Sequence, residues 1–132
     1  MERQKKILDA SIIVKWFLKE EKREGAIALR QAHINDESVI IVPEFLFLEV
    51  LNVLRYKKWN EHNLKEANKS LWDNHLIVEP VNQFMLEKAL KISLEYNLTL
   101  YDSIYAALSQ IHDCPLITED EKLKKFPSAV TL

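Results

Sequence analysis

Four acidic residues occupy positions where a carboxylate is costly, beside apolar strands or on apolar helices. They are Asp9, Glu49, Asp102 and Asp120. A buried carboxylate needs hydrogen bonds, a proton or a cation. Carboxylates that gather at one place repel one another and raise each other's pKa, and a hard divalent cation relieves that repulsion. Such a group predicts a site for Mg²⁺ or Mn²⁺, ions that commonly serve phosphate chemistry.

Two of the acids follow predicted strands. Asp9 comes directly after an apolar pair, and Asp120 comes shortly after a second apolar run. In an open α/β sheet, ligands bind just outside the carboxyl ends of the strands. Because Glu119 and Glu121 flank Asp120, a solvated acidic loop is the alternative interpretation. Glu119 also competes with Asp120 for a role at the site.

Glu49 lies on a helix that is apolar almost all the way round. Between Phe45 and Leu54 the only polar residues are Glu49 and Asn52. A helix of this kind is expected to be buried, and its two polar residues, three positions apart, share one face. The alternative to a metal ligand is a buried glutamate satisfied by Asn52 or by a basic partner.

Asp102 begins the last predicted long helix. An acid in the first turn favours the helix dipole, and Thr99-x-x-Asp102 resembles a capping box. A helix cap is therefore the alternative to a metal ligand at this position.

Short apolar strands alternate with helices along the chain. We expect strands over about 7–8, 39–42, 75–79, 115–118 and 129–132. We expect helices over 11–22, 24–33, 44–58, from 60 or 62 to about 71, 82–96 and 99–113, with Ser11 as the first N-cap. This alternation predicts a parallel sheet covered by helices on both faces, with residues 1–132 forming one domain.

The composition excludes several classes of protein. No apolar run reaches the ~18 residues of a membrane span, and we expect a cytoplasmic protein with no membrane association. The single cysteine, Cys114, excludes an internal disulfide. The lone glycine, Gly25, excludes a glycine-rich phosphate loop. A net charge of −2 argues against a general nucleic-acid binder, unless the acids surround metal ions.

The acidic segments resemble those of the PIN-domain nucleases, and within them the VapC-type toxins of toxin–antitoxin pairs. The similar segments are 7–17, 43–54, 101–108 and 116–120, in the family's order and across nearly the whole chain. The resemblance implies a three-layer α/β/α fold with a central parallel sheet of order 3-2-1-4-5. It also implies that Asp9, Glu49, Asp102 and Asp120 are the catalytic, metal-binding acids, with hydroxyls at Ser11 and Thr118 near the site.

The implied activity is metal-dependent endoribonuclease cleavage of single-stranded or looped RNA, with Mg²⁺ or Mn²⁺ as cofactor. The implied partner is an antitoxin protein that folds over the acidic groove. We also expect a homodimer, because the apolar helix over 45–54 exceeds what one small core can cover, and the resemblance implies the same. RNA also needs positive charge around the acids. The candidates are Lys15, Arg23, Arg55, Lys57 and Lys58, for which solvated helix faces are the alternative.

Other functions remain open at this point. A haloacid-dehalogenase-like phosphatase needs a second aspartate two residues after the first, where this chain has Ser11. A receiver domain needs an acidic pair near its first strand, which is absent here. A non-catalytic PIN-fold metal-binding or scaffold protein remains an alternative to the nuclease.

Overall fold

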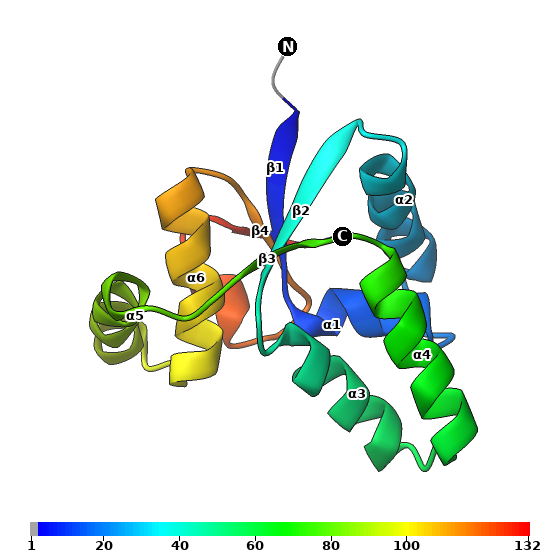
Figure 1. Ribbon diagram of the computed structural model, residues 1–132. Helices are drawn as coiled ribbons and strands as arrows, with labels where there is room; N and C mark the ends of the chain where they lie inside the picture. Colours follow the sequence, from blue (N-terminus) through cyan, green and yellow to red (C-terminus); the bar gives the residue numbers. More distant parts are fainter. Residues whose placement is uncertain (1–2) are drawn as a thin grey trace.

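The computed structural model describes residues 3–132, which fold around a five-stranded sheet in the order β3-β2-β1-β4-β5. All four strand pairs are parallel. The strands are β1 (Gln4–Leu8), β2 (Ser38–Pro43), β3 (Ile77–Glu79), β4 (Leu116–Ile117) and β5 (Ala129–Val130). Figure 1 shows α5 and α6 on one side of the sheet and α1 to α4 on the other. The predicted fold class and strand order are confirmed.

Most helices lie where the sequence predicts them. They are α1 (Ala10–Ile13), the 3₁₀ turn η1 (Val14–Trp16), α2 (Arg23–Ile34), α3 (Leu46–Tyr56), α4 (Glu61–Asp73), α5 (Gln83–Tyr96), α6 (Leu100–His112) and the 3₁₀ turn η2 (Leu123–Lys125). Asn60, Asn82 and Thr99 begin α4, α5 and α6, and each side chain accepts a backbone N–H of the first turn. None of the helices within residues 3–132 is long and apolar enough to cross a membrane.

The first helix is much shorter than predicted. The expected helix over 11–22 breaks into α1 and η1, and Ser11 does not cap it, because Asp9 occupies the N-cap position. A side chain from the start of α2 supplies donors at the point where this helix ends. The guanidinium of Arg23 donates to the carbonyls of Lys15, at 3.0 Å, and Trp16, at 3.3 Å. These bonds satisfy carbonyls that a longer helix would have paired internally.

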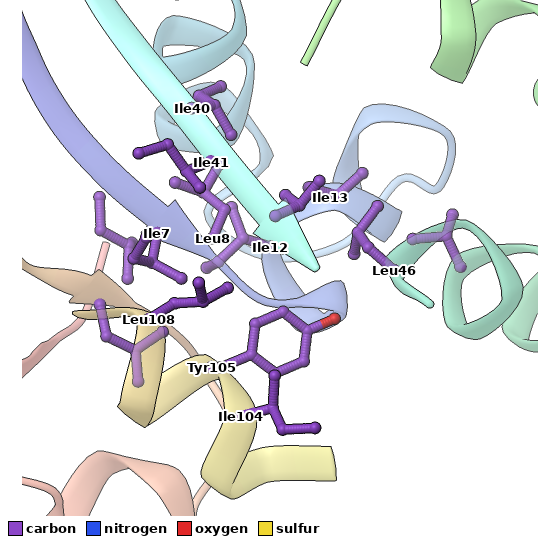
Figure 2. Close-up of a cluster of buried hydrophobic side chains, with 14 of the residues drawn as sticks. Ile7, Leu8, Ile12, Ile13, Ile40, Ile41, Leu46, Ile104, Tyr105 and Leu108 are labelled. Carbon is purple, nitrogen blue, oxygen red and sulfur yellow. The ribbon is translucent and has the colours of Figure 1, made fainter. Parts of the chain in front are cut away.

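The middle of the sheet is fully buried. β1 lies between β2 and β4, and its residues Ile7 and Leu8 are completely inaccessible to solvent. Figure 2 shows these side chains packed with Ile12, Ile40 and residues of α6. Burial on both faces explains why β1 ends in adjacent apolar residues instead of an alternating pattern.

The prediction that α3 is buried all round is wrong. Leu46, Val50 and Leu54 form a buried stripe, but Leu48 is 72% exposed and Tyr56 is 86% exposed. The helix packs against α1, η1 and α4, and Glu49 also contacts α6. An apolar face of α3 is therefore left open.

Several turns place residues other than glycine in the left-handed backbone region. Within residues 3–132 these are Lys22, Asp36, Lys58, His75, Asn97 and Asp113. Asn97 and Asp113 end α5 and α6, where such a conformation commonly terminates a helix. Lys22 instead precedes α2, with φ of 62°.

Two leucine substitutions on α3 test its orientation. Leu46→Ala removes a fully buried side chain and is expected to lower the free energy of unfolding by about 2–5 kcal/mol. Leu48→Ala makes the same change at an exposed position and should cost less than about 0.5 kcal/mol. Urea denaturation of both variants measures the difference, and equal losses would contradict the placement of α3.

Candidate active site

The ends of β1 and β4 bring two distant segments together. Leu8 pairs with Ile117 in the parallel register, so Asp9 and Thr118 leave the sheet side by side. The Thr118 hydroxyl donates to Oδ2 of Asp9 at 2.6 Å, across 109 positions of sequence. The predicted meeting of the first and fourth acidic segments at one sheet edge therefore holds.

Two hydroxyl groups hold the Asp9 carboxylate. Ser11 Oγ donates to Oδ1 at 2.5 Å, while Thr118 donates to Oδ2. Asp9 is only 5% exposed, and burial raises its pKa to about 6. The two hydroxyl bonds lower this pKa, whereas the charges of Asp120 and Asp102 raise it further. Asp9 is thus fixed in orientation but not neutralised.

Glu49 is held in the same way, by a residue that the sequence reasoning missed. The buried Tyr105 of α6 donates its hydroxyl to Oε1 of Glu49 at 2.5 Å, and Asn52 makes no contact of this kind. Burial raises the pKa of Glu49, the Tyr105 bond lowers it, and the charges of Asp102 and Asp9 raise it. The spacing of α6 could have indicated this contact: Tyr105 follows Asp102 by three residues, so both lie on one face of the helix.

Asp102 belongs to the cap of α6 and also lies near the other acids. Its backbone N–H donates to Oγ1 of Thr99 at 3.1 Å, which caps α6. Burial and then the charge of Asp120 raise the pKa of its carboxyl group, while Thr99 and Lys122 lower it. The carboxylate therefore lies in the field of the other acids even though the residue also belongs to a cap.

Glu119 and Asp120 have different surroundings. Glu119 forms an ion pair with Lys22 at 2.9 Å, and its backbone N–H donates to Ser11. Burial raises the pKa of Glu119, but the bond and charge of Lys22 outweigh it, leaving this pKa below its usual value. Asp120 accepts the N–H groups of Lys122 and Leu123 on Oδ1 alone, both at 3.0 Å. Of the two acids, Glu119 alone forms an ion pair with a residue in the range 3–132.

Beyond the effect of burial, the charges of neighbouring acids raise the pKa of Asp9, Glu49 and Asp102, and the charge of Lys122 lowers that of Asp102. Among residues 3–132, no ion pair joins Lys, Arg or His to any of the four acids. Within the same range, no three His, Cys, Asp or Glu side chains stand close enough to enclose an ion by themselves. Mg²⁺ keeps several waters and commonly takes only one or two carboxylates directly. The all-oxygen donor set therefore fits a partly hydrated cation.

A groove of about 1000 Å³ leads away from these acids between α3 and α4. Glu49 and Tyr101 belong to its lining, together with Phe45, Leu48, Leu51, Asn52, Arg55, Trp59, Glu61, Leu64, Lys65 and Asn68. Its wall mixes apolar, amide and charged side chains. Glu49 and the exposed face of α3 therefore line the same groove.

The basic residues selected from the sequence divide into two groups. Lys15 is buried beside Glu20, at 3.4 Å, and Arg23 supports the end of η1. Arg55, Lys57 and Lys58 are exposed at the end of α3. Only this second group is free to contact a macromolecule.

Asp9→Asn is expected to stabilise the metal-free protein in a pH-dependent manner. Burial raises the pKa of Asp9 from 3.8 to about 6, so folded wild-type protein loses stability as the pH rises through this window. The advantage of Asp9→Asn in free energy of unfolding should grow by up to ~3 kcal/mol between pH 4 and pH 7. Urea denaturation in a chelating buffer measures it, and an advantage independent of pH would contradict the burial argument.

Comparisons with known proteins agree with this architecture. The PIN domain family model matches residues 6–128. Ribonuclease VapC3 from Pyrobaculum aerophilum is 28% identical over 135 residues, which cover 96% of this chain and 98% of the relative. A toxin–antitoxin complex from Klebsiella pneumoniae has a chain with a TM-score of 0.70 at 19% identity, covering 95% of both chains. VapC20 from Mycobacterium tuberculosis, described as a sarcin–ricin loop cleaving toxin, gives a TM-score of 0.70 at 15% identity, covering 90% of this chain and 92% of its own.

The resemblance drawn from the four acidic segments is therefore confirmed. The family model leaves only a few residues unmatched at either end of the chain. This protein belongs to the PIN-domain family.

Proposed function

We propose that this protein is a metal-dependent endoribonuclease and the toxin of a VapBC-type toxin–antitoxin pair. The observation that carries the proposal is a group of four acids near the ends of β1 and β4, none of which forms an ion pair with Lys, Arg or His among the described residues. Its substrate class is suggested by the relative named a ribonuclease and by the structural neighbour described as cleaving the sarcin–ricin loop. Residues 1–132 would act as one cytoplasmic nuclease domain.

Asp9, Glu49, Asp102 and Asp120 would hold the Mg²⁺ or Mn²⁺ ions. When bound, these ions supply a Lewis acid that activates water and stabilises charge on the phosphate. The chain contributes the placement of its acids: Ser11 and Thr118 orient Asp9, and Tyr105 orients Glu49. Glu49 and Asp102, both half-buried, would bind the metal directly or through waters, and one of them would orient the attacking water.

Positive charge for RNA would come from outside the acidic centre. Arg55, Lys57 and Lys58 are exposed at the end of α3, and Arg55 also lines the groove that begins at Glu49. Lys122 lies close enough to Asp102 to lower its pKa. These side chains would offset the net charge of −2 along the path of the phosphate backbone.

Exposed apolar surface supports the proposed protein partners. An antitoxin would cover the groove between α3 and α4, where Leu48 is exposed next to the acids and a basic side chain could neutralise them. Two of the similar structures are described as a toxin–antitoxin complex and as VapBC2. On α5, Phe84 and Leu94 are 60% and 86% exposed, which favours association with a second copy of the chain.

Asp9→Asn tests the nuclease directly. Cleavage of mixed RNA with Mg²⁺ or Mn²⁺ should fall by at least ~10²-fold, because the variant loses a metal-binding charge with little change in shape. Asp113→Asn is the matched control, since Asp113 ends α6 in a left-handed conformation that asparagine also tolerates. Equal activity of Asp9→Asn and wild type would reject the proposed function, as would the absence of metal-dependent cleavage in all three proteins.

A second pair of variants separates Asp120 from its neighbour. Asp120→Asn retains an acceptor for the Lys122 and Leu123 amides, so its turn should survive while activity falls by about 10²-fold. Glu119→Gln removes the charge that Lys22 already neutralises and should lower activity less than ~10-fold. Initial cleavage rates at fixed Mn²⁺ measure both, and a larger loss in Glu119→Gln would assign the fourth acid to Glu119.

A further inference from the structure

Tyr105 stands out among the groups that hold the acids. Its side chain is 1% exposed, yet its hydroxyl donates to Oε1 of a glutamate on another helix at 2.5 Å. Figure 2 shows the ring within the buried cluster of isoleucine and leucine side chains. Packing alone would need only a phenylalanine at this position, so the hydroxyl has a separate purpose.

The surroundings of Tyr105 fix the position of this hydroxyl. Phe45 contacts the Tyr105 ring edge-on, with 5.6 Å between centroids and an angle of 85° between the ring planes. Because the ring is also enclosed by the core, it cannot follow Glu49 if that side chain rotates. The hydroxyl is therefore a rigid donor, and Glu49, which is only half-buried, is the mobile partner that it restrains.

The bond engages only one of the two oxygens of the Glu49 carboxylate. Oε1 accepts the Tyr105 hydroxyl, and no other hydrogen bond or ion pair of the described chain engages Oε2. A lysine or arginine in place of Tyr105 would cancel the charge that attracts a cation, whereas a neutral hydroxyl leaves it intact. Groups that orient a metal ligand in this way commonly change metal affinity by 10- to 100-fold when they are removed.

We infer that Tyr105 is a positioning residue that holds Glu49 with Oε2 turned toward the divalent cation. This inference rests on the proposed function, which assigns Glu49 to the metal site. Tyr105 would act only through Glu49, since its hydroxyl is already donated to Oε1. Without the Tyr105 hydroxyl, Glu49 would sample more rotamers. A smaller fraction of them would direct the carboxylate toward the cation.

Tyr105→Phe tests the inference with little risk to folding, because the ring and its packing remain. The dissociation constant for Mn²⁺, measured by calorimetry without RNA, should rise about 10-fold. Tyr96→Phe is the matched control: Tyr96 packs edge-on against Phe126, and its hydroxyl makes no hydrogen bond within residues 3–132. This control should bind Mn²⁺ like the wild type.

A double-mutant cycle with Glu49→Gln separates positioning from a general structural effect. If Tyr105 acts through Glu49, adding Tyr105→Phe to Glu49→Gln should cause no further loss of Mn²⁺ affinity. The same loss in both backgrounds, wild-type affinity of Tyr105→Phe, or equal losses in Tyr105→Phe and Tyr96→Phe would overturn the inference.

The Mn²⁺-binding measurement tests the role of Tyr105 separately from the nuclease assay. A wild-type protein that binds Mn²⁺, shows the expected Tyr105 dependence and cleaves no RNA would reject the proposed nuclease while leaving the role of Tyr105 intact. A wild-type protein that binds no Mn²⁺ would overturn both.

Discussion

The site depends on buried carboxylates that are held in place by uncharged hydrogen-bond donors. Hydroxyl groups of Ser11, Thr118 and Tyr105 fix the two most buried site carboxylates, Asp9 and Glu49, and none of these donors carries a charge. Hydrogen bonds to hydroxyls orient a carboxylate but offset only part of its desolvation and none of its repulsion by other acids. The folded chain thus preserves an unbalanced charge at one edge of its sheet.

The rest of the fold positions that charge. Strand order places β1 beside β4, so residues more than a hundred positions apart share a hydrogen bond directly outside the sheet. The other two acids come from helices, Glu49 from α3 and Asp102 from the first turn of α6. A parallel sheet suits this task because the carboxyl ends of its strands face the same way. The buried core under β1 makes the arrangement rigid.

Local patterns in the sequence predicted the strands, most helices and the positions of the four acids. Apolar runs such as 39–42 and caps such as Asn60, Asn82 and Thr99 are read directly from neighbouring residues. The failures involve contacts that a local pattern does not show. Arg23 donates to the carbonyls at the end of the shortened first helix, and Tyr105 satisfies Glu49 from 56 positions away. The apolar composition of α3 suggested that one small core would not cover the whole helix, but it did not show which face stays exposed, because that depends on how the helix packs.

The ion pair between Lys22 and Glu119 has a consequence for how the chain tolerates change in length. Lys22 adopts a left-handed conformation before α2, and Glu119 is also tied to Ser11 through its backbone. The short connection over 17–22 is therefore anchored at the edge of the acidic centre, and an inserted residue there would displace the segment that carries Asp120. The connection over 17–22 is therefore a poor place for an inserted tag or a new terminus, which exposed segments far from the acidic centre carry more readily.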